Sequence, residues 1–180
     1  NEGDPVVLHD GSADRWILTN FAFAFDGSGN PIAPFYQCFA ISKSSDPIAG
    51  GWWFYAVQMD TGGAGKPPAN TLNDYGKFGL WTDCLYMGAN GFNNSSGIYA
   101  GAIFAAFNRT TLFAGQALSS TNSSIGFISA SPPFSLFPAN LLGTSAGSLP
   151  PTGTPEYFVD ESGTAFDWEV RKFVQGPNVC

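Results

Sequence analysis

Acidic side chains are the most numerous candidates for chemistry in this chain, with 14 Asp and Glu against 7 Lys and Arg. Hydrolysis of a glycosidic bond needs two carboxyl groups that face each other across a sugar, roughly 5–9 Å apart. Five acidic residues are candidates for such a pair: Asp4, Asp14, Asp74, Asp83 and Glu156. Their spacing in the sequence identifies no pair, so we expect each to cap a turn or to lie in solvent.

His9 is the only histidine. One histidine does not make a zinc site by itself, and a Ser-His-Asp triad would have to use this residue. No Gly-x-Ser-x-Gly motif accompanies it, and the glycine-rich run before Lys66 is followed by Pro67 rather than by a phosphate-binding helix. We therefore expect His9 to be a residue at a strand end, and the sequence predicts no catalytic residue.

Calcium is the one cofactor that the sequence leaves open. Asp26, Ser28 and Asn30 place three oxygen donors at alternate positions, and Asp10 and Asp14 flank another short polar turn. Hard cations bind several oxygen ligands, but no glutamate follows Asp26 at the spacing of a calcium loop. These aspartates are weak calcium candidates, and no other metal is predicted.

Tryptophans could bind a sugar by stacking on its ring. Trp52, Trp53 and Trp81 are the candidate ligand-binding residues, and Trp168 is a further aromatic of this kind. The alternative is that they belong to the core, where aromatic residues on strands are more often found.

Cysteine and asparagine carry the candidate covalent modifications. Three cysteines, Cys38, Cys84 and Cys180, leave one over if two of them form a disulfide. The remaining one is either paired with another molecule or is a buried free thiol. Asn-x-Ser/Thr triplets that could carry glycans begin at Asn93, Asn94, Asn108 and Asn122, of which the last three are the candidates we retain.

Composition indicates an all-β protein forming a single domain over residues 1–180. Only 12% of residues are charged while 16% are aromatic, and Gly (22) and Pro (13) are abundant. The net charge of −7 argues against nucleic-acid or anionic-membrane partners, and no apolar run approaches the roughly 18 residues of a membrane span. Asn1 is not an initiator methionine, so we expect a processed or partial chain.

Alternating apolar residues predict hairpins that position these groups. Residues 38–59 form one, with a turn at Asp46–Gly51, and residues 3–24 form another. Strands are also expected at 75–88, 98–107 and 125–129, a helical turn at 108–115, and a last hairpin at 156–174. Both faces of residues 52–59 are apolar, which predicts a sheet covered on both sides.

The hairpins recur roughly every 40 residues, the spacing of propeller blades. A β-propeller or propeller fragment of about four blades explains this, because small sheets with two apolar faces need neighbours on both sides. A β-sandwich is the competing fold.

Four segments occur together and in this order: Gly3–Leu18, Phe35–Ser42, Asn73–Asp83 and Gly153–Val159. The set resembles a largely uncharacterised family of exported bacterial β-propeller-like proteins. The resemblance implies a partial propeller, and it implies that Cys38 would pair with a cysteine preceding Asn1. It implies no established activity. Residues 44–52 also loosely resemble the Asp-box turn of sialidase propellers, where this turn is structural.

The predicted function is that of a non-catalytic extracellular or cell-surface module for binding or scaffolding, as a subunit of a larger assembly. Its expected partner is another protein chain or missing blades of the same protein, with carbohydrate as a further ligand. The alternative is a glycosidase-like enzyme on a propeller.

Overall fold

The computed structural model describes residues 3–129, 133–141, 149–151, 153–161, 163–164, 167–174 and 179–180. They form three antiparallel sheets. Sheet A consists of β1 (Gly3–Asp10), β2 (Arg15–Phe25), β3 (Pro31–Ser42) and β4 (Trp52–Gln58). Sheet B consists of β5 (Thr71–Leu80), β6 (Cys84–Asn93), β7 (Tyr99–Asn108) and β8 (Ser123–Ser129). Sheet C consists of β9 (Phe137–Pro138), β10 (Tyr157–Glu161) and β11 (Trp168–Lys172), and the short helix α1 is Arg109–Phe113.

Short polar side chains close the turns that join these strands. In the β3–β4 loop, Asp46 Oδ1 accepts hydrogen bonds from the backbone N–H groups of Ile48 (2.8 Å) and Ala49 (3.0 Å). In α1, Asn108 Oδ1 accepts from the Thr111 N–H at 3.0 Å. Such side chains replace the hydrogen bonds that the chain loses where it reverses or where a helix begins. The predicted hairpins at residues 3–24 and 38–59 and the predicted helical turn are confirmed.

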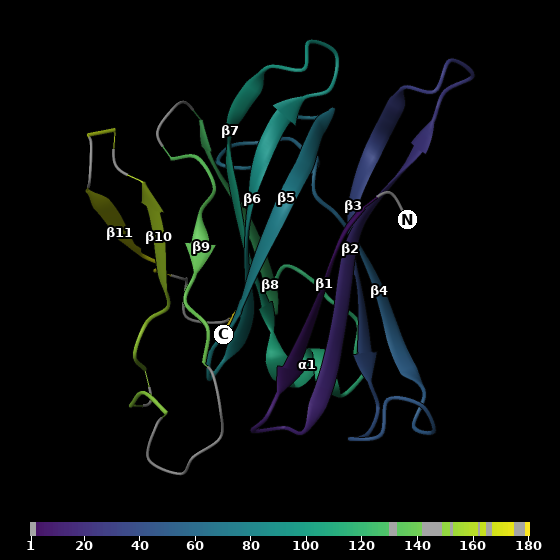
Figure 1. Cartoon of the computed structure of the whole chain (residues 1–180), viewed down its shortest axis with the longest axis vertical. Coiled ribbons are helices and arrows are strands. Elements are labelled where there is room, and N and C mark those ends of the chain that lie inside the picture. Colours follow the sequence, from purple (N-terminus) through teal and green to yellow (C-terminus); the bar gives the residue numbers. More distant parts are fainter. Residues whose placement is uncertain are drawn as a thin grey trace.

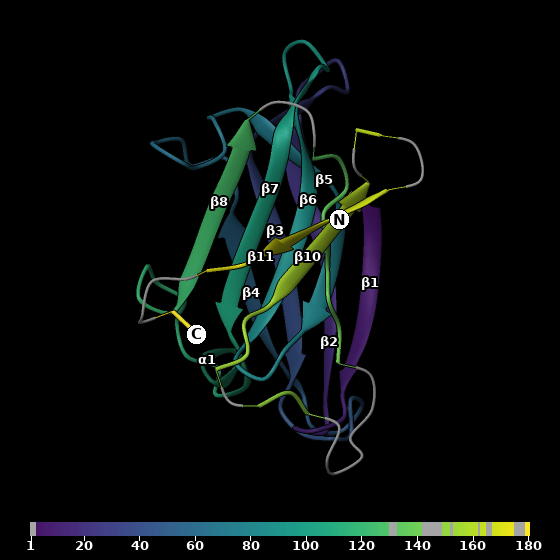
Figure 2. The same cartoon turned by 90° about the vertical axis from the view of Figure 1, so that its left-hand side faces the viewer.

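Sheet B is the middle layer of the molecule (Figure 1), and side chains on both of its faces are buried. Leu85 and Met87 on β6 point toward sheet A and pack in a cluster with Phe39. Tyr86, which alternates with them, packs on the opposite face in a second cluster with Phe158 of sheet C. Because successive side chains of a strand point to opposite faces, β6 has buried residues on both of its faces. Figure 2 shows sheet C in front of sheet B.

Two glycines allow the chain around β9 to approach sheet B closely. A Cβ atom on Gly88 would lie 2.0 Å from the carbonyl oxygen of Leu136, and one on Gly79 would lie 2.0 Å from that of Ala139. Any side chain at either position would therefore push sheet C away from sheet B. A disulfide between Cys84 and Cys180, with Cα atoms 5.7 Å apart, links sheet B to the residues that follow sheet C.

The predicted all-β class is confirmed, whereas a propeller of about four blades is not. The described residues form three sheets, and these do not close on one another. The hairpin at residues 3–24 and the hairpin at residues 38–59 belong to one sheet, because β2 pairs with β3 as well as with β1. Because the two hairpins merge in this way, they form one four-stranded sheet and not two separate blades. Among the described residues, no helix is long and apolar enough to cross a membrane.

Candidate functional site

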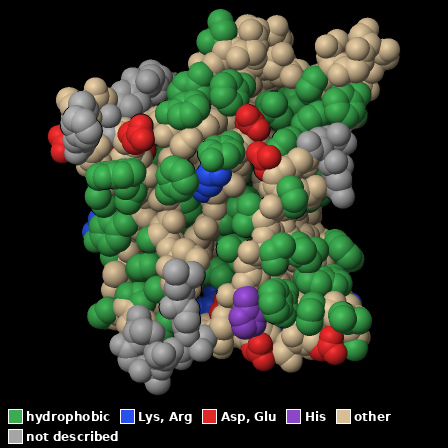
Figure 3. Space-filling view, viewed as in Figure 1, with side chains coloured by type: hydrophobic (Ala, Val, Ile, Leu, Met, Phe, Trp, Pro, Cys, Tyr) green, Lys and Arg blue, Asp and Glu red, His purple; other side chains and the backbone are tan. Residues whose placement is uncertain are grey.

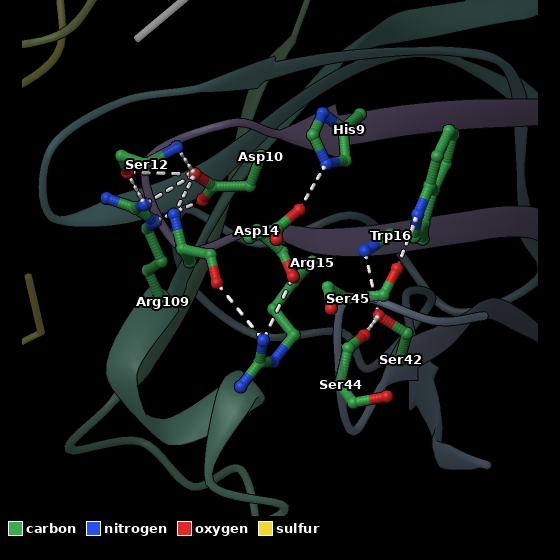
Figure 4. A network of polar contacts seen from close by, with 11 residues as sticks. His9, Asp10, Ser12, Asp14, Arg15, Trp16, Ser42, Ser44, Ser45 and Arg109 are labelled. Carbon is green, nitrogen blue, oxygen red and sulfur yellow. Dashed lines mark hydrogen bonds and ion pairs between the residues drawn. The ribbon is translucent and has the colours of Figure 1, made fainter. Parts of the chain in front are cut away.

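The buried carboxylate of Asp10, at the C-terminal end of β1, joins sheet A to sheet B (Figure 4). Asp10 Oδ1 accepts hydrogen bonds from the N–H groups of Ser12 and Ala13, both at 3.0 Å, and from Ser12 Oγ at 2.9 Å. Arg109, at the start of α1, donates from Nη2 to Asp10 Oδ1 at 2.6 Å and from Nε to Oδ2. Asp10 is 5% exposed. Its carboxylate is thus occupied by structural partners, and this network fixes the two sheets to each other.

His9 lies beside this network on the exposed side of β1 (Figure 4). Its Nε2 is 3.1 Å from Asp14 Oδ1, and its ring packs on Trp16 with ring centres 4.7 Å apart. The hydroxyl of Ser12 donates to Asp10 and not to the imidazole. His9 therefore occupies the strand-end position that the sequence predicts.

The calcium candidates are not brought together. Asp10 binds Arg109, Asp14 contacts His9, and Asp26 closes the β2–β3 turn by accepting from the N–H groups of Ser28 and Asn30 at 2.8 Å. Hydrogen bonds from Asn30 and Ser28 lower the pKa of Asp26. The part of the chain that the structure describes holds no group of three or more His, Cys, Asp or Glu able to bind a metal ion. Calcium binding stays a prediction.

The candidate tryptophans do not form one stacking surface. Trp53 packs at the edge of the core between sheets A and B, with Lys43 Nζ 3.9 Å from its ring centre. Trp52, the preceding residue of the same strand, points to the opposite face of sheet A. Trp81 lies in the β5–β6 turn, and its Nε1 donates to the Thr154 carbonyl at 2.9 Å. The contacts of Trp53 and Trp81 are those of packing residues.

The candidate glycosylation sites have side-chain amides that already donate hydrogen bonds. Asn94 Nδ2 donates to the Pro31 carbonyl at 2.9 Å, Asn108 Nδ2 to that of Val179 at 3.1 Å, and Asn122 Nδ2 to that of Ala117 at 3.0 Å. A glycan on any of these nitrogens would replace a hydrogen that now makes a tertiary or turn contact. Glycosylation stays a prediction.

The side of sheet A that faces away from sheet B is exposed and apolar. We call it the outer face of sheet A. Val7, Leu18, Ala40 and Phe54 are paired neighbours that form a row across all four of its strands. Val7 is 55% exposed and Phe54 is 78% exposed. The sequence predicts a covering layer on both faces of β4, and within the described part of the chain only the face toward sheet B has one.

A hollow of about 570 Å³ lies in this face, between β2, β3 and β4. No charged side chain lines it among the described residues, and Cys38 lies in it next to Leu18 and Phe54. Cys38 is a half-buried free thiol, and burial raises its pKa. Of the three cysteines, Cys84 and Cys180 are therefore the pair, and Cys38 is the one left over. The predicted site residues did not include Val7, Leu18 or Phe54. The apolar residues on both faces of β4 were the feature of the sequence that could have indicated this surface.

Asp83 and Glu156, two of the five candidate acids, line one cavity of about 270 Å³. Asp83 lies in the tight β5–β6 turn, in which the Trp81 N–H donates to the Cys84 carbonyl at 3.0 Å. Glu156 precedes β10, and its own carbonyl accepts from the Phe173 N–H at 2.8 Å. The hydrogen bond from Trp81 Nε1 to the Thr154 carbonyl holds the β5–β6 turn against the segment that precedes β10. The other candidate acids, Asp4, Asp14 and Asp74, do not line this cavity.

The carboxyl group of Glu156 is buried. The residue is 1% exposed, and neither of its carboxyl oxygens has a hydrogen-bond partner among the described residues. The nearby Ala139 N–H donates to the Tyr157 carbonyl at 2.9 Å. Burial raises the pKa of Glu156 to about 8, with a smaller rise from Asp83 and an opposing effect of the Ala139 amide. At neutral pH the group is therefore mainly protonated, and it can donate as well as accept a hydrogen bond.

Comparison with known proteins gives the chain no relatives: no protein-family model, no curated protein and no solved structure matches it. Its function has to be inferred from the geometry described above.

Proposed function

We propose that the chain is a non-catalytic extracellular module for binding or scaffolding, and that its outer face of sheet A binds a further antiparallel β-sheet. The observation that carries the proposal is the row of apolar side chains across all four strands of sheet A, in which Val7, Leu18 and Phe54 are exposed. Exposed apolar surface of this extent marks an interaction site. The partner is missing blades of the same protein or another protein chain of the same architecture.

The arrangement of the sheets supports an arc of a β-propeller. Sheets A and B are each a meander of four strands, neighbouring strands pairing in sequence order. The sheets stack in chain order, with β5 packed against β1, β2 and β3 of sheet A, and β9 packed against β5 and β6 of sheet B. In a propeller the blades are such meanders around a central axis. An arc of this kind has two uncovered ends.

Both ends of the stack have the surface that this arrangement requires. Hydrophobic side chains are exposed on the side of sheet A and on the side of sheet C (Figure 3). On sheet C, Trp168 is 67% exposed and Val170 is 61% exposed. We infer that the partner at an uncovered face is a further sheet, because the interface between sheets A and B and the one between sheets B and C are each formed by the apolar faces of two sheets. A disulfide fits the proposed extracellular location.

Sedimentation velocity on the isolated 180-residue chain tests this proposal. With its end faces uncovered, the 19.0 kDa chain is expected to self-associate as its concentration rises. The variant Phe54→Lys should shift the distribution toward the monomer, and Tyr75→Lys, an exposed aromatic on sheet B, is the matched control. A well-folded wild-type monomer at all concentrations would contradict the proposal.

A second candidate function is hydrolysis of a glycosidic bond, which the joint position of Asp83 and Glu156 favours. Such a reaction uses two carboxyl groups, and both acidic residues are in the lining of one cavity. The test is turnover of a panel of chromogenic glycosides by the wild-type chain. Loss of that turnover in Asp83→Asn and in Glu156→Gln would support the enzyme, whereas no turnover by the wild type would exclude it for the substrates assayed.

A further inference from the structure

We propose that a second copy of this chain pairs with the open edge of sheet A, so that the β4 strands of the two copies run antiparallel about a two-fold axis. The contact uses the backbone at the edge of the sheet and not its outer face, so the inference goes beyond the proposed function. It starts from the strand order, in which β4 pairs with β3 on one side and with no described strand on the other. An edge strand of this kind is a template for pairing with another chain.

The backbone groups that point to the open edge belong to alternate residues of β4. In antiparallel strands, residues that bond to one neighbour alternate with residues that face away from it. The Met59 N–H donates to the Phe35 carbonyl of β3 at 2.9 Å, so the odd-numbered residues of β4 bond to β3. The even-numbered residues therefore direct their N–H and carbonyl groups outward. Of these, Phe54, Ala56 and Gln58 are exposed, and no other described element bonds to their backbone groups.

The other sheet edges of the described chain have features that oppose strand pairing. β1 contains aspartate, proline and a register shift, and β5 contains charged residues and a register shift. On β8, the Phe127 N–H donates to the Gly65 carbonyl at 2.9 Å. β9 is two residues long, and β11 carries Glu169, Arg171 and Lys172. Proteins protect sheet edges by such means. β4 has no charge, no proline and no register shift.

The seven residues of β4 fit a second copy of themselves. With the two-fold axis at Tyr55, Trp52 lies opposite Gln58 of the other copy, and Phe54 lies opposite Ala56 of the other copy. All outward-pointing residues then pair with one another, and each such pair exchanges both of its N–H···O bonds. A register shifted along the strand leaves outward groups at the strand ends without a partner. The strand is therefore complementary to itself in one register over its whole length.

The side chains fit this pairing on both faces. On the outer face, the large Phe54 side chain lies opposite the small Ala56. On the face toward sheet B, Trp53, Tyr55 and Val57 pack at the margin of the core and are only partly buried. A second β4 strand would cover these side chains further, and cross-strand pairs of aromatic and β-branched residues stabilise antiparallel strands. No like charges meet, since β4 carries none.

Sedimentation equilibrium and residue-resolved hydrogen exchange test whether the edge is used. Ala56→Pro removes an outward N–H, which an edge strand tolerates, whereas the matched control Ala56→Val keeps it. Ala56→Pro should weaken the dimer by about tenfold or more, because it removes hydrogen bonds on both sides of the axis, and Ala56→Val should dimerise like the wild type. In the wild-type dimer, the amides of Phe54 and Ala56 should exchange about tenfold or more slowly than in the monomer, while those of Tyr55 and Val57 are protected in both.

Cysteine cross-linking tests the register. In a Cys38→Ser background, a mixture of Trp52→Cys and Gln58→Cys chains should form a disulfide-linked dimer under mild oxidation, and neither chain should do so alone. In the proposed register, identical positions at the strand ends lie ~20 Å apart. A disulfide needs Cα atoms within ~7 Å. Sheets that dock face to face are ~10 Å apart, so association through the outer face does not give this pattern.

Two results would overturn the inference. One is a wild-type chain that stays monomeric, with the amides of Phe54 and Ala56 exchanging freely at all concentrations. The other is a dimer that Ala56→Pro leaves intact and that does not cross-link between positions 52 and 58. Loss of that second dimer in Phe54→Lys would assign the contact to the outer face and not to the edge. Cross-linking does not depend on the proline variant, so it decides the question even where Ala56→Pro fails to fold.

Discussion

The pH dependence of unfolding tests the buried state of Glu156. Burial raises the pKa of this carboxyl from the ordinary 4.5 to about 8. Between these two values the folded protein holds a proton that the unfolded chain has released. The free energy of unfolding therefore contains a favourable contribution that is complete below pH 4.5 and is lost as the pH rises toward 8.

The size of this effect follows from the same values. One pH unit corresponds to about 1.4 kcal/mol for a proton that only one of the two states holds. At pH 7, which lies 2.5 units above the ordinary value, the protonation costs the fold about 3 kcal/mol. Glu156→Gln removes this cost, because the amide is neutral in both states. We expect the variant to gain about 3 kcal/mol in free energy of unfolding at pH 7 and little at pH 4.5.

Urea unfolding followed by tryptophan fluorescence at pH 4.5, 7 and 8.5 measures the difference. Glu161→Gln is the control, since Glu161 is exposed and its replacement should leave the pH profile unchanged. Other titrating groups contribute equally to wild type and variant, so the comparison isolates Glu156. Parallel pH profiles for wild type and Glu156→Gln would refute the reasoning, because they would show that the carboxyl ionises in the folded protein as it does in the unfolded chain.

Three further perturbations test the contacts between the layers and the outer face. Arg109→Met leaves the buried carboxylate of Asp10 with neutral donors only, and we expect urea unfolding to show a loss of about 2–3 kcal/mol. Gly88→Ala places a methyl group 2.0 Å from the Leu136 carbonyl oxygen, and a loss of at least about 2 kcal/mol with faster hydrogen exchange in β9 and β10 is expected. Cys38 should react slowly with a maleimide at pH 7 because burial raises its pKa, and still more slowly under conditions that favour self-association.

Matched controls separate these effects from unspecific ones. Arg15→Met removes an arginine that donates to the nearby backbone carbonyls of Ala13 and Asp14, and it should cost less than about 1 kcal/mol. Gly27→Ala adds a methyl group with no atom within 4 Å and should be tolerated.

Equal losses for Arg109→Met and Arg15→Met would show that the link between sheets A and B does not depend on the ion pair. A Gly88→Ala variant as stable as the wild type would show that β9 does not depend on close approach to sheet B. Cys38 reactivity unchanged by self-association would show that the outer face of sheet A is not the contact surface.

The sequence by itself determined the local structure, because this depends on neighbouring residues. Alternation of apolar side chains located the strands, as at Phe39 and Ile41 of β3, since a strand with a buried face shows a period of two. Asp46 in the hairpin loop and Asn108 before α1 were identifiable because short polar side chains bond to the backbone a few residues away. The all-β class followed from these elements and from the composition.

Only the tertiary structure decided how many sheets these strands form. Residues 26–34 read as a connector, yet β2 extends to Phe25 and β3 begins at Pro31, so that the segment between them is a turn of one sheet. Alternation with a period of two indicates that a segment is a strand, but it does not indicate which other strands pair with that segment in the sheet. Hence the hairpins could not be distinguished from separate blades.

The candidate site shows the same division. Glu156 was one of five acids that the sequence treated alike, and the partner of none could be identified. Its burial results from the packing of sheet C on sheet B, which depends on Gly79 and Gly88 of β5 and β6 and brings the residues before β10 against the turn that holds Asp83. The pKa of a carboxyl and the exposure of an apolar face depend on atoms that are distant in sequence, so residue types and spacing determine neither.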